Sequence, residues 1–126
     1  MLRVFLVEDD QSMVDVLLEL LPLTDDVECV GFATEEVAAV TWLVTHRDQW
    51  DLAIVDLMLS EGSGLRVLSS CRVHAGHQRM VVLSNHVTRD TTRRCIDLGA
   101  DATFDKATGC EKLLAYCRNL ARKQAA

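Results

Sequence analysis

Carboxylate side chains follow two short apolar runs of the chain. Glu8 and Asp9 come directly after the first run, and Asp56 lies near the end of the second, residues 52–59. If the three side chains meet, their negative charges repel one another unless a cation is present. Oxygen ligands on an open site favour Mg²⁺, which keeps several waters and binds a few carboxylates together with phosphoryl oxygens. The sequence therefore predicts a site for Mg²⁺ (or Mn²⁺).

A hydroxyl and an ammonium group follow two later apolar runs. Ser84 ends the run 79–84, and Lys106 follows the short run 102–105. A metal ion, a fixed ammonium and a hydroxyl around one carboxylate suit in-line phosphoryl transfer, in which Asp56 supplies the nucleophilic oxygen. Each residue alone also has an ordinary structural explanation: a strand-end aspartate that caps a loop, a strand-end hydroxyl, a solvated lysine, and an acidic start to a helix.

Five apolar runs alternate with helical patterns along the chain. The runs are typical of strands buried on both faces of a sheet; they cover residues 3–7, 27–33, 52–56, 79–84 and 102–105. Apolar residues at helical spacing predict helices over 13–21, 34–46, 65–71 and 88–98, and a last helix that ends near residue 123. In the second helix, Val37, Val40 and Val44 are expected on the inner side. The helix over 88–98 has a thin apolar stripe and is expected to be the least stable.

This alternation predicts one domain, residues 1–126, with a three-layer α/β/α sandwich. Right-handed crossovers place helices on both faces of a parallel sheet. We expect the flavodoxin-like (βα)5 arrangement with strand order 2-1-3-4-5, whose switch point lies between the first and third strands. Glu8, Asp9 and Asp56 would then meet at one crevice beyond the carboxyl ends of these strands.

Composition excludes several classes of protein. The formal net charge of −6 gives no general attraction to nucleic acid or to an anionic membrane. Five cysteines without a C-x-x-C motif argue against a disulfide framework and against a zinc site, and they fit a reducing, cytoplasmic location. Neither a signal peptide nor a run of membrane-spanning length is apparent.

These motifs resemble those of the receiver domains of two-component response regulators over essentially the whole chain. The residues that carry the resemblance are the acidic run 8–10, Asp56 with Gly64 eight residues later, Ser84, and Gly99 to Asp101 followed by Lys106. The resemblance implies that Asp56 accepts a phosphoryl group from a histidine kinase or a histidine phosphotransfer protein. Such a domain would catalyse only its own phosphorylation and slow autodephosphorylation.

The resemblance also implies roles for the neighbouring residues. Asp9, Asp56 and the backbone carbonyl of Met58 would bind the metal directly, with Glu8 acting mainly through water. Lys106 would pair with the acids and then with the phosphoryl group, and Ser84 would turn to hydrogen-bond a phosphoryl oxygen. The bound group would bias the weak helix over 88–98 and the face that it forms with the last strand and helix, where a downstream protein would bind.

Several positions depart from the usual pattern of these domains. Ser60 and Ala107 stand where prolines are usual; a cis bond before alanine would cost about 3 kcal/mol, so we expect a trans Lys106–Ala107 bond. Thr103 replaces a usual aromatic switch residue, while Phe104, on the opposite side of the strand, is expected in the core.

The resemblance also implies that Met58 and His86, which flank the expected site, influence the rate of hydrolysis. By the same resemblance, Asn85 would slow the entry of the phosphoryl group or hydrogen-bond it. An apolar Met58 would impede an attacking water, so we expect a long-lived acyl phosphate.

Other interpretations follow from the same residues. The departures suggest a second hypothesis, a degenerate receiver that binds partners independently of phosphorylation. The retained Asp56, Asp9 and Lys106 argue against this hypothesis. A phosphatase with an aspartyl nucleophile would need a second acid where Met58 stands. Three basic residues of the helix over 88–98 fit either an acidic partner or a solvated surface: Arg89, Arg93 and Arg94. We expect a monomer or a weak dimer that forms on phosphorylation.

Overall fold

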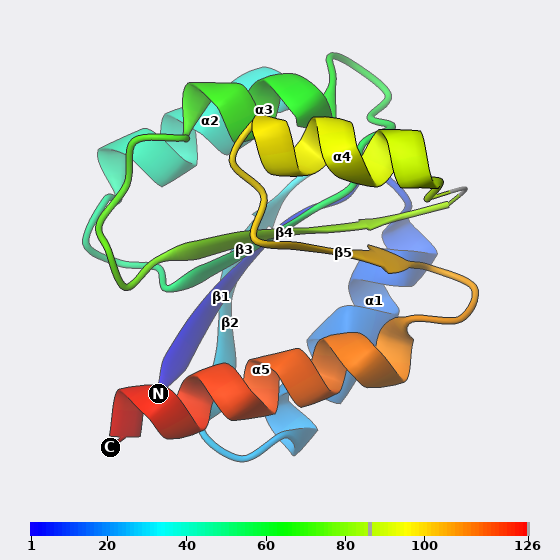
Figure 1. Ribbon diagram of the computed structural model, residues 1–126. Helices are drawn as coiled ribbons and strands as arrows, with labels where there is room; N and C mark the ends of the chain where they lie inside the picture. Colours follow the sequence, from blue (N-terminus) through cyan, green and yellow to red (C-terminus); the bar gives the residue numbers. More distant parts are fainter. Residues whose placement is uncertain (86, 126) are drawn as a thin grey trace.

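The computed structural model describes residues 1–85 and 87–125 and contains a five-stranded parallel sheet of order β2-β1-β3-β4-β5 (Figure 1). The strands are β1 (Leu2–Val7), β2 (Val27–Ala33), β3 (Leu52–Val55), β4 (Arg79–Ser84) and β5 (Ala102–Asp105). The helices are α1 (Gln11–Leu20), the 3-10 turn η1 (Leu21–Leu23), α2 (Glu36–Thr45), α3 (Gly64–Ser70), α4 (Arg89–Asp97) and α5 (Cys110–Ala125). The predicted fold class and strand order are confirmed.

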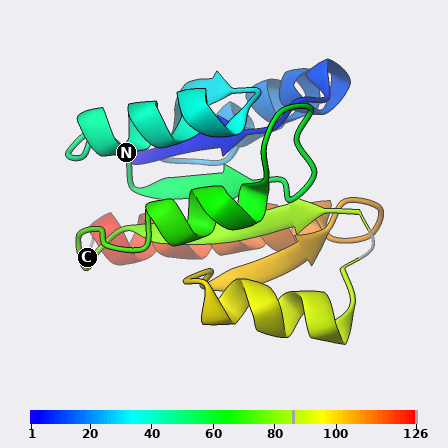
Figure 2. The same cartoon turned by 90° about the horizontal axis from the view of Figure 1, so that it is seen from above.

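The sheet lies between two layers of helices, and its strands alternate their side chains between them. Helices α2, α3 and α4 cover one face, and α1 and α5 cover the other (Figures 1 and 2). On β1, Leu2, Val4 and Leu6 join the core against α1 and α5, whereas Phe5 and Val7 join the core against α2 and α3. This period of two is the geometry of an extended strand that is buried on both sides.

The inner face of α2 differs from the predicted one. Ala39 and Leu43 are buried, and Val40 packs against the core as predicted, but Val37 is 70% exposed and Val44 is also exposed. Helix α2 is apolar on nearly every side from residue 37 to 44, so its sequence does not single out one stripe. Instead, tertiary packing decides, as in the stacking of Trp42 on Phe5 of β1 with ring centroids 4.2 Å apart.

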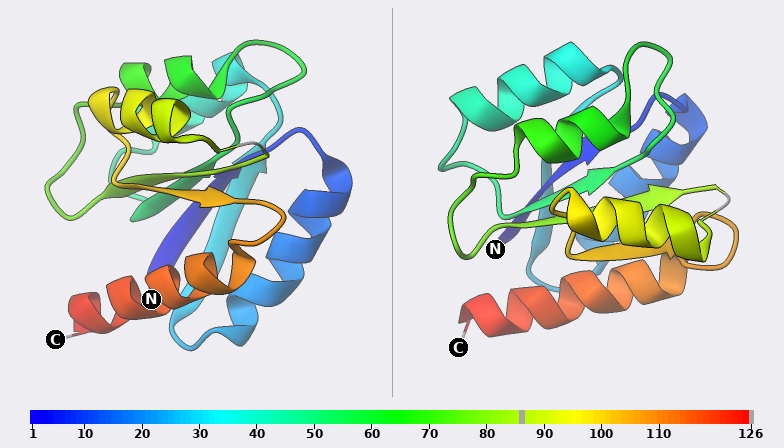
Figure 3. Two further views of the ribbon diagram at one scale, coloured as in Figure 1. Left: turned by 45° about the vertical axis from the view of Figure 1, so that its right-hand side comes forward. Right: turned by 45° about the horizontal axis from the view of Figure 1, so that its top comes forward.

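The carboxyl ends of the strands open on one side of the molecule, where the loops before α1, α3 and α5 gather (Figure 3). The Asp56 N–H donates to the Val7 carbonyl oxygen at 2.8 Å, which joins the ends of β1 and β3. Among the described residues, none of the helices combines the length and the apolar character required to cross a membrane.

Candidate functional site

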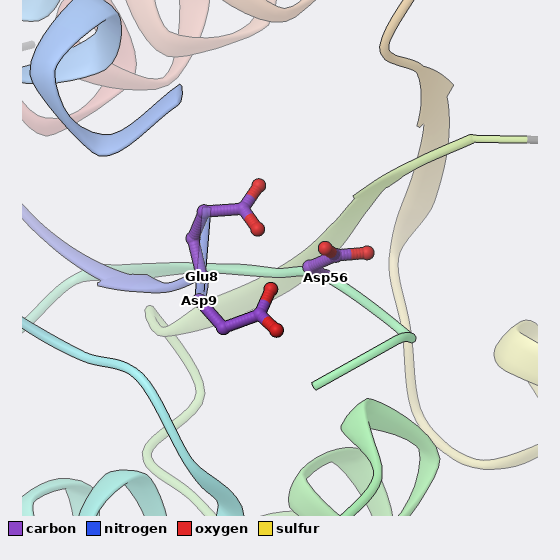
Figure 4. Close-up of side chains that lie close together, drawn as sticks. All are labelled: Glu8, Asp9 and Asp56. Atoms are coloured by element: carbon purple, nitrogen blue, oxygen red, sulfur yellow. The ribbon is translucent and has the colours of Figure 1, made fainter. Parts of the chain in front are cut away.

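Three carboxylates meet at the carboxyl ends of β1 and β3. Oxygen atoms of Glu8, Asp9 and Asp56 lie within 4.8 Å of one another, and their side chains point toward a common space (Figure 4). Glu8 and Asp56 are buried. The geometry therefore brings together the three acidic residues that the sequence singled out.

Lys106 reaches this cluster from the turn after β5. Its Nζ lies 2.6 Å from Glu8 Oε1 and 2.9 Å from Asp56 Oδ2, and its side chain is only 11% exposed. Burial alone would lower the pKa of Lys106, but its hydrogen bonds to Glu8 and Asp56 outweigh burial and raise that pKa. Lys106 is therefore a fixed cation beside two of the carboxylates.

Both carboxylate oxygens of Asp56 have partners. The Ser84 hydroxyl donates to Oδ1 at 2.9 Å, and the Met58 N–H donates to the same oxygen at 3.2 Å. Lys106 Nζ donates to Oδ2. The side chain that was predicted as the nucleophile is thus oriented from three separate segments of the chain.

The charge of the cluster is incompletely balanced. Three carboxylates lie around one ammonium group, and the two buried ones have little contact with water. Burial raises the pKa of Glu8 to about 7, and the nearby Asp56 carboxylate adds to this effect against the opposing influence of Lys106. A hard divalent cation fits this oxygen donor set because it would supply the missing positive charge.

Asp10, the third acid of the run, has a structural task. Its Oδ1 accepts hydrogen bonds from the backbone N–H and the hydroxyl of Ser12, at 3.0 and 2.7 Å, and it caps the N-terminus of α1. Asp followed two residues later by Ser at the start of a helical pattern was the available signal for this cap.

Gly64 positions the backbone of Asp56. A Cβ built on Gly64 would lie 2.0 Å from the Asp56 carbonyl oxygen, so only glycine allows this approach. The Gly64 N–H also donates to the Leu57 carbonyl oxygen at 3.0 Å. The sequence suggested this glycine as part of a motif, but not the contact that requires it.

Three of the remaining predicted site residues lie in the described part of the chain: Met58, Asn85 and Thr103. Met58 is 76% exposed, and Asn85 is exposed directly after β4. Thr103 faces α4, where its hydroxyl lies 3.1 Å from that of Thr92. His86, the other residue expected to influence hydrolysis, lies outside the described residues.

The chain's departures from the usual pattern have the expected structural consequences at two positions. The Lys106–Ala107 peptide bond is trans, as predicted. Phe104 packs against the core on the α5 side and meets Tyr116 edge to face, with ring centroids 5.7 Å apart. Phe104 therefore serves as a core residue on the α5 side of β5. The side of β5 that faces α4 carries Thr103 in place of the usual aromatic residue.

Comparison with known proteins gives a match over most of the chain. Residues 4–118 match the model of the family described as response regulator receiver domain. The response regulator protein PmrA of Pseudomonas aeruginosa is 34% identical over 123 residues, which cover 97% of this chain and 53% of PmrA. The alginate biosynthesis transcriptional regulatory protein AlgB of Pseudomonas putida is 30% identical over 123 residues, which cover 97% of this chain and 27% of AlgB. The chain thus spans about half of one relative and about a quarter of the other.

Solved structures have the same fold. The response regulator domain of CheB from Thermotoga maritima superposes with a TM-score of 0.84 at 21% identity, and the match covers 97% of each chain. A CheY-like receiver domain protein from Methanospirillum hungatei gives a TM-score of 0.79 at 20% identity, covering 99% of this chain and 97% of that one. At these identities, the likeness supports the fold alone.

Proposed function

The chain belongs to the response regulator receiver domain family, and we propose that it accepts a phosphoryl group on Asp56 from a histidine kinase or a histidine phosphotransfer protein. The single observation that carries the proposal is the contact of Asp56 with both Lys106 and Ser84, each at 2.9 Å. These contacts surround a buried carboxylate with the two donors that a transferred phosphoryl group needs.

In the proposed reaction, an Asp56 carboxylate oxygen attacks the phosphorus atom of the phosphohistidine. A new P–O bond forms while the P–N bond breaks, and the electron pair of that bond leaves with the imidazole nitrogen. The donors that now bind the free carboxylate, Ser84 Oγ and Lys106 Nζ, then bind oxygens of the attached phosphoryl group. The reaction needs no group beyond the donor protein and a metal ion. The chain would therefore catalyse only its own phosphorylation and slow autodephosphorylation.

Mg²⁺ or Mn²⁺ is proposed to be held by four oxygen donors: the carboxylates of Glu8, Asp9 and Asp56 and the backbone carbonyl of Met58. When bound, the cation would neutralise the charge on the transferred phosphoryl oxygens. The fit rests on the donor set, since three carboxylates gather around one ammonium group. Within the chain, Glu8 also holds Lys106, so the acid and the lysine orient each other.

The proposed output surface is formed by α4, β5 and α5. The three arginines of α4 are exposed, and none forms a salt bridge with another described residue. We propose that a downstream protein with an acidic docking segment binds there, because it would pair with Arg89, Arg93 and Arg94. We also propose that the domain is a monomer or a weak, phosphorylation-dependent dimer, whereas direct nucleic-acid binding by a domain of net charge −6 is disfavoured.

A degenerate receiver that binds partners without phosphorylation is the second candidate. It is favoured by four residues that depart from the family pattern: Ser60, Asn85, Thr103 and Ala107. The contacts of Lys106 with Glu8 and Asp56 argue against it. A module that only binds partners does not require a lysine that orients the buried Asp56 carboxylate.

The deciding experiment is incubation with Mg²⁺ and acetyl phosphate, followed by intact mass measurement. We expect the protein to gain the mass of one phosphoryl group, and Asp56→Asn to gain none. Asp10→Asn is the matched control, because it removes the same charge from the acid that follows Asp9 and caps α1. This variant should still be labelled. Equal labelling of Asp56→Asn would remove Asp56 from its role, and no labelling of the unchanged protein would favour the degenerate receiver.

A further inference from the structure

The turn between β5 and α5, residues 105–109, carries Lys106 and folds back on Asp105. The Ala107 N–H donates to Asp105 Oδ1 at 2.8 Å, the two-residue spacing of an Asx turn. The Gly109 N–H donates to the Asp105 carbonyl oxygen at 2.6 Å. Two N–H groups that follow Lys106 are thus bound to the residue that precedes it.

Asp105 is itself fixed on the sheet. As the last residue of β5, it pairs with Ser84 of β4, and the next N–H, that of Lys106, donates to the Ser84 carbonyl oxygen at 3.0 Å. Gly109 is buried, and a Cβ built there would lie 2.6 Å from the Asp105 carbonyl oxygen. The start of α5 therefore packs directly on the Asp105 backbone.

The turn at residues 105–109 sets the backbone position of Lys106. The flexible side chain of Lys106 must bring its ammonium group from there to Glu8 and Asp56. Lysine loses considerable rotamer freedom when its ammonium group is held, and here Nζ is held between Glu8 and Asp56. Ala107 contributes an N–H that proline lacks, and the Asp105 carboxylate is its acceptor. We infer that Asp105 is a positioning residue for Lys106, because its carboxylate fixes the Lys106–Ala107 turn through the Ala107 N–H. The inference rests on the proposed role of Lys106 in phosphoryl transfer.

The test compares Asp105→Ala with Asp105→Asn. Both remove the same charge, but only asparagine retains an oxygen that can accept the Ala107 N–H. We expect Asp105→Ala to lower the rate of phosphorylation at saturating acetyl phosphate and Mg²⁺ by about fivefold, the effect of losing one hydrogen bond. Asp105→Asn should retain most of the rate. The Kd for Mg²⁺, measured by calorimetry, should change little in either variant, because the acids that bind the metal come from β1 and β3.

Two backgrounds show whether Asp105 acts by the inferred route. In Ala107→Pro the donor is already absent, so Asp105→Ala and Asp105→Asn should have equal rates. In Lys106→Met the ammonium group is absent, so Asp105→Ala should cause no further loss. Each result supports the inference.

Three results would overturn it. Equal rates for Asp105→Ala and the unchanged protein would do so while leaving the proposed function intact. A loss of the same size in the Lys106→Met background would also overturn it, because Asp105 would then act by another route. Failure of the unchanged protein to label at all would overturn the proposed function and this inference with it.

Discussion

The hydroxyl of Thr103 on β5 lies 3.1 Å from the hydroxyl of Thr92 on α4, within hydrogen-bond distance. This pair links the last strand to a helix whose sequence is a poor helix former, with only Cys95 fully buried. Thr103 stands where, by the family resemblance, an aromatic switch residue is usual. A small polar pair therefore joins β5 and α4, two elements of the proposed output surface.

Removing either hydroxyl should loosen α4. We expect Thr103→Val to speed amide hydrogen exchange in residues 89–97 and to lower the local free energy of opening by about 1 kcal/mol, since one hydrogen bond is lost. Thr92→Val should have the same effect, and the double variant should add nothing to either single one. Additive losses in the double variant would mean that the two hydroxyls act separately.

The affinity for Mg²⁺ should fall below neutral pH. The pKa of Glu8 is raised to about 7, so the side chain is mostly protonated below that pH and must lose its proton to act as a ligand. Above pH 7 the carboxylate is already charged, and the affinity should level off. We expect the Kd for Mg²⁺, measured by calorimetry, to rise steeply from pH 8 to pH 6. In Glu8→Gln the affinity should be weak at both values and the difference much smaller; an unchanged slope would assign the proton to another group.

Gly64→Ala should destabilise the protein although alanine favours helices. Helix propensity alone predicts a gain of about 1 kcal/mol at the first residue of α3. The new Cβ would lie 2.0 Å from the Asp56 carbonyl oxygen, and such overpacking costs about 1–3 kcal/mol. We expect a lower free energy of unfolding in urea and slower phosphorylation of Asp56. Gly76→Ala is the matched control, because a Cβ there meets no atom within 4 Å, and it should leave both quantities nearly unchanged.

Much of the fold and the site could be predicted because both depend on local patterns. The alternation of Leu2, Val4 and Leu6 with Phe5 and Val7 indicates a strand buried on both faces. Two acids directly follow this strand in the sequence, so their place at its carboxyl end could be predicted. Helix α2 could not be oriented, since its apolar residues surround the axis. The role of Gly64 could not be predicted either, because it depends on a close approach between two backbone segments in the folded chain.

Met58 should control the lifetime of the phosphorylated state. Its apolar side chain is 76% exposed at the rim, two residues from Asp56, and offers an attacking water no hydrogen bond. We expect Met58→Asn to shorten the half-life of the phosphoprotein about tenfold, which corresponds to about 1.4 kcal/mol less barrier. Met58→Leu should retain the long half-life, and Val73→Asn, at an apolar residue 90% exposed in the connection between α3 and β4, should not change it. Intact mass measured over time after removal of the phosphodonor gives these half-lives, and a half-life of seconds in the unchanged protein would contradict the shielding by Met58.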